Sequence, residues 1–482
     1  MNGRSRALWR NSWTIPTAGR PSEPLAAAVS KHNSRGSTPF RTSSPYIRLC
    51  CQPRGSLRSR LRERKFRKRP QPQRPCNRCC LALSLMPAKI RWPVNPATCF
   101  QKQRNPRRSR LSAERKIRKP FRQFISQEAG KLNVVANVVC VDPRTDSLWC
   151  QLVQQAPSSV FHSPEWMKVL SETYGWEPSA SILLDEQGQP QAGLPFFRIS
   201  DILGERIVAL PFSDYCDPLV NNEESWRILI DQLIAERHPV SVRCLHNNLP
   251  LGDARFTLAK QAKWHRLGLQ PDLEALWKAM HDSTHRAIRK SEREGLTVRM
   301  AQSEQELRVF FEMHLRVRKY KYGLLAQPYN FFQNIWRNFV EPGHGFLMLA
   351  IHNGKIVAGD FFLEWKDTLY YKFNASLPDD LSHRPNDLLI WQGIQEGKKR
   401  GLAYLDFGLS DIDQDGLIRY KRKFGTEEKT ISFLRHSPNV SPTPAEKEMR
   451  GLLSKLTNRF TDQLVPDLVT ERAGEDLYRL FT

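Results

Sequence analysis

From about residue 158 onward, apolar side chains recur along the chain at spacings typical of helices and strands. Residues 164–174 carry apolar positions at helical spacing; Ser163 before them suits an N-cap, Pro164 the first turn and Gly175 the C-terminal end. The remaining pattern up to residue 245 predicts strands at 181–184, 192–198, 206–210 and 239–245, and a helix at 226–236. This mixture of helices and hairpins is typical of an α+β sheet domain.

A second, similar series of elements begins near residue 271. Apolar residues at helical spacing predict one long helix over 271–295, and the pair Asn353-Gly354 predicts the turn of a hairpin. The other predicted elements are strands at 296–301, 346–351, 355–365, 368–375, 403–407 and 430–434, and helices at 304–319, 329–339, 386–400 and 447–460. This order resembles acyltransferases of the GNAT type, and the first half repeats part of it. We therefore expect an α+β fold of two tandem GNAT-like domains with a ligand site between them.

The net charge of +25 belongs to the first 125 residues alone. They contain 31 lysines and arginines and three acids, whereas the remainder contains 43 basic and 46 acidic residues. The segment is rich in Arg, Pro, Ser and Gln, so it cannot bury enough apolar surface to offset chain entropy. The expected organisation is a disordered basic extension at 1–133, GNAT-like domains at 134–268 and 269–438, and a C-terminal helical tail at 439–482.

Four more specific hypotheses address the basic extension. It is upstream sequence translated from a start site placed too early, an RNA-binding arm through the run 58–69, an organelle transit peptide, or a metal site at Cys76, Cys79 and Cys80. One CxxCC motif lacks a second ligand pair at finger spacing, and the segment is several times too long for a transit peptide. We therefore favour the start-site hypothesis.

Cysteine usage and hydropathy favour a cytoplasmic location. Beyond residue 100 only Cys140, Cys150, Cys216 and Cys244 occur, scattered, which suits a reducing compartment rather than a disulfide framework. No apolar run reaches the roughly 18 residues that span a bilayer, and we expect no secretion signal. We also expect no metal, because the body's histidines lack metal-ligand spacing: His162, His281, His285, His314, His344, His352 and His383.

Four segments of the second half carry a resemblance to a known family. They are 283–296, 316–332, 385–391 and 405–425. The first contains the pattern R-x-I-R-K-x-E-x-x-G, and the last joins Leu-Asp-Phe-Gly to an Asp-Gly pair and the run Tyr-Lys-Arg-Lys-Phe-Gly. Together, and in this order, they resemble the Fem family of peptidoglycan-bridge aminoacyltransferases.

This resemblance implies a double-GNAT fold and an enzyme that moves an amino acid from aminoacyl-tRNA onto an amine of a cell-wall precursor. Relatives in exopolysaccharide and protein-sorting systems imply acyl-CoA as a second class of donor. The acceptor would be a muropeptide or a sugar-linked amine, with peripheral contact to a lipid-linked precursor, and no tightly bound cofactor is implied. The chain lacks both the charged coiled-coil arm of some Fem proteins and the usual GNAT phosphate loop, so the donor stays open.

Three residues are the catalytic candidates. Aminolysis of an ester or thioester removes a proton from the amine and builds charge on a tetrahedral oxyanion. Lys421, after an Asp-Gly loop, could neutralise a phosphate or the oxyanion; alternatively it is a solvated lysine in a basic run. Asp406, at the end of a buried strand, could act as base or orient one; alternatively it caps the next turn through Ser410. Asp214, beside Tyr215, lies in a first-half loop expected to face the second half.

The substrate-binding candidates are basic or lie near the expected acyl site. Arg289 and Lys290 close a helix and could hold a diphosphate, or form a solvated helix face. Asn386 is expected to cap a helix whose N-terminal amides form an anion site, or only to cap it. Tyr371 and Asn374 lie on the strand where GNAT folds place the acyl group, or serve only in strand packing. The full candidate set is Arg286, Arg289, Lys290, Arg318, Tyr215, Tyr371, Asn374, Asn386 and Ser410.

Three functions follow from the sequence. The first is Fem-type transfer to a nucleotide- or lipid-linked muropeptide. The second is acyl-CoA-dependent N-acetylation of an amino sugar, which the missing phosphate loop disfavours. The third is a nucleic-acid-binding protein that uses the basic arm, which the near-neutral charge beyond residue 125 disfavours.

Overall fold

Local capping residues set helix boundaries in the computed structural model, which describes residues 137–438 and 444–482. Helix α2 (Pro164–Tyr174) shows this most clearly. The Ser163 hydroxyl accepts a hydrogen bond from the Trp166 N–H at 3.1 Å, and Gly175 ends the helix at a φ of 70°. The predicted boundaries of this helix are therefore confirmed. The expectations for residues 1–133, with their RNA, transit, start-site and cysteine hypotheses, lie outside the described residues.

One twelve-stranded sheet runs through the described residues, in the order β1-β2-β3-β4-β5-β12-β6-β11-β10-β9-β8-β7. Its strands are β1 (Asn137–Val141), β2 (Pro178–Leu184), β3 (Pro190–Asp201), β4 (Gly204–Val208), β5 (Val240–Cys244), β6 (Thr257–Gly268), β7 (Thr297–Met300), β8 (Gly345–His352), β9 (Lys355–Trp365), β10 (Thr368–Ser376), β11 (Tyr404–Asp411) and β12 (Glu427–His436). The mixed α and β content expected from the sequence is confirmed.

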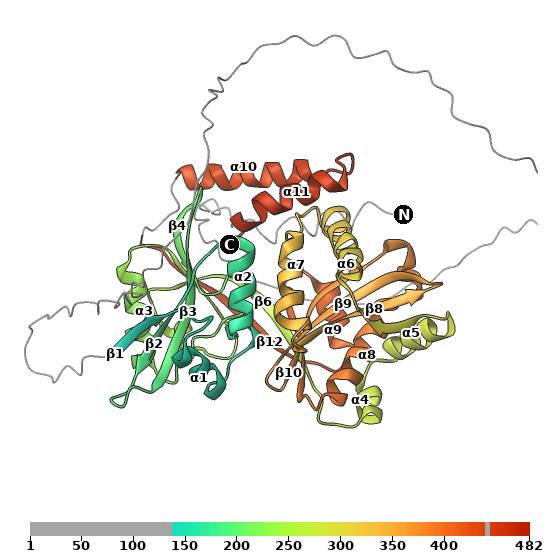
Figure 1. Cartoon of the computed structure of the whole chain (residues 1–482), viewed down its shortest axis with the longest axis horizontal. Helices are drawn as coiled ribbons and strands as arrows, with labels where there is room; N and C mark the ends of the chain where they lie inside the picture. The colour runs from blue at the N-terminus through green and yellow to red at the C-terminus, as the bar shows by residue number, and fades with distance from the viewer. Residues whose placement is uncertain (1–136, 439–443) are drawn as a thin grey trace, which may run out of the picture. The chain divides into compact units, whose positions relative to one another are not determined.

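Helices cover both faces of this sheet (Figure 1). They are α1 (Ser147–Gln155), α2, α3 (Glu223–Ala235), α4 (Leu273–Ala279), α5 (Asp282–Arg293), α6 (Glu304–Arg316), α7 (Tyr329–Ile335), α8 (Pro385–Lys399), α9 (Asp415–Arg422), α10 (Pro444–Phe460) and α11 (Asp467–Leu477). In the first half, α3 packs on the face that carries Leu194 and Phe196, while α1 and α2 pack on the face of Phe197 and Ile199. In the second half, α5 and α8 share a core with Phe362, and α6 and α7 share the other with Phe361. Alternate residues of one strand thus feed opposite layers.

The two halves exchange strands at the middle of the sheet. Strand β12, from the end of the second half, lies between β5 and β6, both of which precede that half in sequence. Ser432 on β12 is opposite Cys244 on β5, and Ile431 is opposite Ala262 on β6. The expected domain boundary near residue 268 therefore falls at the end of a strand that pairs only with second-half strands. Strands of one half therefore provide hydrogen-bonding partners for strands of the other half.

The C-terminal segment, which contains helices α10 and α11, contacts both halves (Figure 1). The Arg308 guanidinium pairs with Glu471 at 2.7 Å, and the fully buried Lys319 ammonium pairs with Asp467 at 2.8 Å. The Arg206 side chain on β4 hydrogen-bonds to Thr482. The expected helical tail is thus present over residues 444–482 and is tied to the sheet by charged groups.

One helix predicted from the sequence is wrong in its extent. The continuous helix expected over 271–295 is two helices, α4 and α5, which break at Met280 and His281. Met280 takes an extended ψ of 151°, and the His281 ring accepts from the Ser283 N–H at 3.1 Å as an N-cap. The His281 side-chain cap therefore begins a new helix, although the apolar residues continue at helical spacing across this position. Elements β1, α1, β6 and α9 were not predicted.

Membrane-spanning helices are not found in the described part of the chain. None of its helices is both long enough and apolar enough to cross a bilayer.

Candidate active site

Strands β10 and β11 separate partway along their length. Their parallel register ends at the pair Tyr370 and Asp406, although both strands continue. Just beyond that pair, β10 shifts register against β9 between Tyr371 and Phe373, and β11 shifts against β6 between Asp406 and Leu409. The sheet is therefore interrupted at its middle, and charged side chains meet there.

A loop of the first half brings Asp214 to this interruption. Leu210 and Phe212 in that loop hold φ angles of 55° and 58°, which cost a non-glycine residue on the order of 1–3 kcal/mol each. The Asp214 carboxylate accepts from the Lys372 ammonium at 2.6 Å and from the Leu409 N–H at 3.4 Å. The strained loop is thus fastened to both separating strands.

Asp214 is the more accessible member of its ion pair. Its side chain is 22% exposed, against 7% for Lys372. Burial raises the pKa of Asp214, but the Lys372 charge and hydrogen bond, with the Lys421 charge, outweigh burial and hold the pKa below its ordinary value. Asp214 is therefore a carboxylate at neutral pH.

Asp406 lies on the other side of the interruption and is 2% exposed. Its carboxylate accepts from the Trp264 indole N–H at 2.9 Å, the Gly408 N–H at 2.6 Å and the Tyr215 hydroxyl at 3.1 Å. Burial raises the pKa of Asp406 to about 6, against the lowering effect of the Trp264 and Gly408 bonds. The strand continues past Asp406 to Asp411, so the expected strand end is wrong, and the carboxylate bonds Gly408 rather than Ser410.

Lys421 is a buried residue of α9, not a loop residue or a solvated lysine. Its ammonium donates to the carbonyl oxygens of Gly408 and Leu409, both at 2.9 Å. Burial lowers the pKa of Lys421 to about 8, while the Asp214 and Asp406 charges oppose that change. The lysine therefore braces the irregular part of β11 and adds positive charge beside two carboxylates.

Gly408 is required by the packing of this region. It has a φ of 66°, and a Cβ atom there would lie 2.6 Å from an Asp214 carboxylate oxygen. Both facts make any residue with a Cβ atom unfavourable at this position. Gly408 thus lets β11 approach the Asp214 loop closely.

We call Asp214, Lys372, Asp406 and Lys421 the ion cluster. The structure brings together the three sequence candidates Asp214, Asp406 and Lys421, and their catalytic role stays a prediction. Lys372 was missed. Its Nζ lies 4.7 Å from the Phe161 ring centroid and 5.5 Å from that of Trp166. The sequence signal was a lysine between Tyr371 and Phe373 in a strand, where a solvated side chain is the usual expectation.

A second polar group lies on β9, β10 and the start of α8. The Asn374 amide donates to Asp360 at 2.6 Å and to Asn386 at 3.2 Å, and the Asn386 amide lies 3.5 Å from the Ser376 hydroxyl. Asp360 is fully buried, one of its oxygens has no hydrogen-bond partner among the described residues, and burial raises its pKa to about 8. We call Asp360, Asn374, Ser376 and Asn386 the amide cluster.

Asn386 is not the cap of α8, which corrects the expectation. Arg384, at a φ of 61°, is the N-cap, and Pro385 is the first helical residue. Because proline suits that first position, the helix begins one residue before Asn386. The Asn386 side chain is thereby free to join the amide cluster.

Tyr371 lies near Asp360 and Asp387. Burial is the largest cause that raises the pKa of the Tyr371 hydroxyl well above its ordinary value, and the negative charges of these two acids raise it further.

The other sequence candidates are spread more widely. Arg286 and Arg289 are exposed on α5, with the Arg289 guanidinium 5.7 Å from the Trp277 ring, and Lys290 pairs with Glu294 at 3.5 Å. Arg318 donates to the Leu325 carbonyl at 3.1 Å. Within the described residues, none of these cations forms a hydrogen bond or an ion pair with the ion cluster. Ser410 is buried on β11, and its hydroxyl has no hydrogen-bond partner there.

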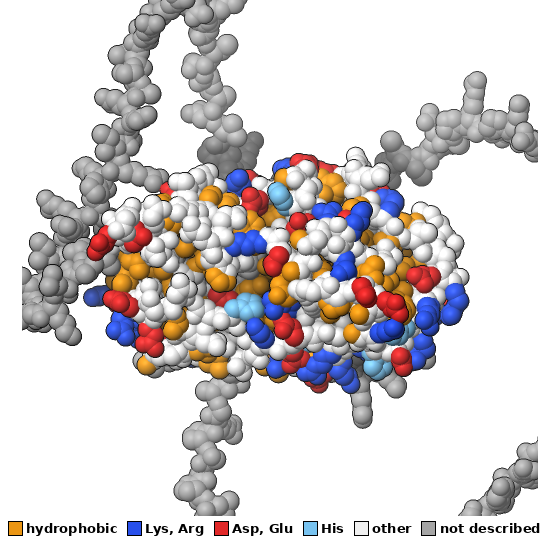
Figure 2. All heavy atoms as spheres, turned by 90° about the horizontal axis from the view of Figure 1, so that it is seen from below, with side chains coloured by type: hydrophobic (Ala, Val, Ile, Leu, Met, Phe, Trp, Pro, Cys, Tyr) orange, Lys and Arg blue, Asp and Glu red, His pale blue; other side chains and the backbone are white. Residues whose placement is uncertain are grey.

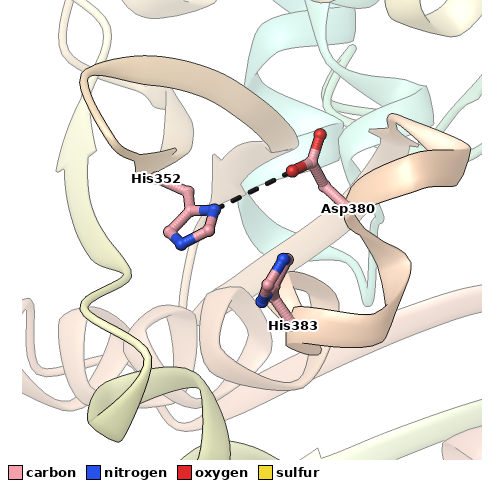
Figure 3. Close-up of side chains that lie close together, drawn as sticks. All are labelled: His352, Asp380 and His383. Carbon is pink, nitrogen blue, oxygen red and sulfur yellow. Dashed lines mark ion pairs between the residues drawn. The ribbon is translucent and has the colours of Figure 1, made fainter. Parts of the chain in front are cut away.

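One group of side chains has metal-ligand character. His352, Asp380 and His383 come together from two segments of the second half (Figure 3). Sequence spacing could not show this group, because 28 residues or more separate His352 from the other two. The expectation of no metal therefore remains untested.

Comparison with protein families identifies the second half. Residues 278–422 match the model described as an acetyltransferase (GNAT) domain. That range contains Lys372, Asp406 and Lys421, whereas Asp214 precedes it. The expected GNAT-like fold is confirmed. No curated protein matches the chain.

Several solved structures are similar to this chain. One titled as the crystal structure of FemX is 13% identical, with a TM-score of 0.48, and covers 64% of this chain and 99% of its own. L-PGS from Bacillus licheniformis is 12% identical, with a TM-score of 0.43, and covers 67% and 99%. A tandem GNAT protein from the clavulanic acid biosynthesis pathway is 11% identical, with a TM-score of 0.44, and covers 63% and 99%.

Proposed function

The chain is an acyltransferase with a GNAT domain over residues 278–422, and we propose that it moves an aminoacyl or acyl group onto an amine of a cell-wall or exopolysaccharide precursor. The motif resemblance over 283–425 supports this class of acceptor. A cytoplasmic reaction, with peripheral contact to a lipid-linked precursor, is part of the same proposal.

The observation that carries the proposal is the ion cluster at the point where β10 and β11 separate. Four charged groups from a first-half loop, two strands and a helix meet there; Asp406 and Lys421 are buried, and Asp214 and Lys372 are partly buried. Burial of charge is costly unless each group is paired. Such an arrangement is typical of reaction centres, where perturbed pKa values serve catalysis.

The cluster suits aminolysis of an ester or thioester. The amine nitrogen attacks the acyl carbon, the C–N bond forms, and the C–O or C–S bond breaks as the leaving group takes a proton. Asp214, charged and partly exposed, would orient the amine and accept its proton. Lys421 and Lys372 would offset the negative charge that develops on the acyl oxygen. Asp406, with all its bonds to protein donors, would position Tyr215 and the Gly408 backbone.

The charge at the start of α8, beside the amide cluster, helps to distinguish between the two classes of donor. A CoA pyrophosphate is an anion of the kind that helix N-termini and cations bind. The start of α8 instead carries Asp387, whose pKa burial raises to about 6, so that its carboxyl group is mainly ionised at neutral pH. Carboxyl groups suit the α-ammonium of an aminoacyl donor better than a pyrophosphate, so we favour aminoacyl transfer over acyl-CoA.

A nucleic-acid-binding body is disfavoured by charge. Residues beyond 125 hold 43 basic and 46 acidic side chains. On the face shown in Figure 2, basic and acidic side chains are interspersed rather than segregated. Binding of a nucleic acid through phosphates requires a basic surface.

The test is a transfer assay on the full chain with both donor classes. Aminoacyl-tRNA or acetyl-CoA is mixed with a nucleotide-linked muropeptide or an amino sugar, and amide products are detected by mass spectrometry. Product from aminoacyl-tRNA supports the proposal. Product from acetyl-CoA alone, with saturable binding by calorimetry, replaces it with the acyl-CoA function. A folded chain that gives no product with either donor, yet binds RNA in a salt-dependent way, overturns it.

A further inference from the structure

Two imidazoles and a carboxylate converge beside the β8–β9 hairpin. His352 ends β8, and Asp380 and His383 lie on the 3₁₀ turn η5 (Pro378–His383) that precedes α8. One donor atom of each lies within 4.8 Å of the others, and the two imidazole centroids are 4.3 Å apart (Figure 3). The three side chains thus form a compact donor set of two nitrogens and one oxygen.

The donor distances suit an ion better than direct bonding. The His352 Nδ1 and Asp380 Oδ1 atoms are 3.8 Å apart, too far for a hydrogen bond. Ligands of tetrahedral zinc, each about 2.1 Å from the metal, lie roughly 3.4 Å from one another. Small side-chain rotations would therefore bring these donors to ligand separation. Their side chains are 15%, 16% and 29% exposed, which leaves a route for an ion and a water.

A supporting shell already surrounds His383. Its Nδ1 lies 2.5 Å from the Glu294 carboxylate. A carboxylate on one imidazole nitrogen holds the proton there and leaves the other nitrogen unprotonated, as in many metal-bound histidines. The Ser291 hydroxyl contacts the carbonyl oxygens of His383 and Arg384 at 2.8 and 2.9 Å. The end of α5 thereby fixes both the ring and the backbone of η5.

One cation competes for the same carboxylate. The Lys355 ammonium lies 3.7 Å from Asp380 Oδ2, and its side chain is 66% exposed. A solvated lysine on a flexible stem holds such a partner weakly. A divalent ion bound by three donors would displace it.

We propose that His352, Asp380 and His383 bind one divalent transition-metal ion of the zinc class, with water as the fourth ligand. Imidazole and carboxylate donors select zinc-like ions over magnesium or calcium, which prefer all-oxygen sites. The bound ion would clamp η5 to the β8–β9 hairpin. Because α8 begins two residues after His383, the clamp would also fix the start of the helix that carries Asn386. This inference does not depend on the proposed reaction.

The test is zinc titration by calorimetry on the full chain. Cys76, Cys79 and Cys80 are changed to serine in every sample, because those thiols could bind zinc separately. We expect one zinc per chain. His352→Gln and His383→Gln should each weaken binding at least ~100-fold, and Glu294→Gln by roughly 10- to 100-fold. Lys355→Met should bind as tightly as the parent or more tightly.

A matched control and a variant-free readout complete the design. His344→Gln, an exposed histidine outside the group, should bind like the parent. Metal-free variants should melt at the temperature of the metal-free parent. If they do not, zinc-edge X-ray absorption of the serine-substituted parent decides, with two imidazoles and oxygen ligands expected. Absence of binding by the parent, unchanged binding in folded His352→Gln, or a sulfur or histidine-free shell would overturn the proposal.

Discussion

The Lys372 ammonium on β10 and the Asp214 carboxylate in the loop after β4 form a 2.6 Å ion pair that joins the two halves of the chain. The pair lies where β10 separates from β11, so a charged contact is found where the hydrogen bonds between these two strands end. Asp214 is held ionised there mainly by Lys372 against the effect of burial. The state of this carboxylate thus depends on a residue more than 150 positions away in sequence.

Lys372→Met should shift the acid limb of the pH–rate profile upward. Without the nearby ammonium, burial dominates, and the pKa of Asp214 should rise. Activity that requires the carboxylate then appears only at higher pH. Transfer rates between pH 4 and 9 check this, with the exposed Lys399→Met as control. An unchanged acid limb would show that Asp214 does not govern the rate.

Gly408→Ala should destabilise the fold and impair transfer. The new methyl group meets an Asp214 oxygen at 2.6 Å and is also strained by the positive φ. We expect a loss of about 2 kcal/mol in the free energy of unfolding. Gly416→Ala is the control, because its added Cβ meets nothing within 4 Å and its φ is not positive. Equal stability of the two variants in urea denaturation would contradict the close approach.

Lys421 should impose an alkaline limit on activity. Its pKa is lowered to about 8 by burial, so the ammonium is present below that pH and is lost as pH rises through it. The transfer rate of the wild type should therefore fall above about pH 8. Lys421→Met should be slow at every pH and lack this limb, whereas Lys423→Met should keep the wild-type profile. A wild-type rate that stays level to pH 10 would exclude a role for the charge.

Asp360→Asn should stabilise the chain at alkaline pH. The pKa of Asp360 is raised to about 8 by burial, so the folded state keeps a proton that the unfolded chain releases above its ordinary pKa near 4. Stability from this group is complete at low pH and declines as pH rises toward 8. An amide cannot ionise, so the variant should gain at least about 1.4 kcal/mol at pH 9 relative to its gain at pH 5. Parallel urea denaturation curves at both pH values would refute the buried neutral acid.

Local features of the fold could be predicted from the sequence, whereas contacts between distant segments could not. Ser163 and Gly175 define α2 because capping depends on neighbours along the chain. The same kind of feature misled the prediction over 271–295, where the His281 cap breaks an unbroken apolar period. The position of β12 between β5 and β6 leaves no local trace, because it depends on pairing between halves.

The candidate site shows the same contrast between local features, which the sequence predicts, and contacts between distant segments, which it does not. Motif order drew attention to Asp406 and Lys421, but it could not reveal that both act on the Gly408 backbone. Lys372 was missed because only the Asp214 loop, from the other half, makes a buried lysine tolerable. The His352 group was missed for a similar reason, since hairpin and turn meet only in the folded chain.

The ion cluster as reaction centre is tested most directly by the transfer rate of Asp214→Asn. With the donor and acceptor that give product, amide formation by the full-length variant is compared with the wild type and with Asp413→Asn, an exposed neighbour on the β11–α9 connection. Circular dichroism confirms that each sample is folded. We predict a fall of at least ~100-fold for Asp214→Asn and a change within about twofold for Asp413→Asn. A folded Asp214→Asn variant that transfers at the wild-type rate would contradict the assignment of the reaction to this cluster.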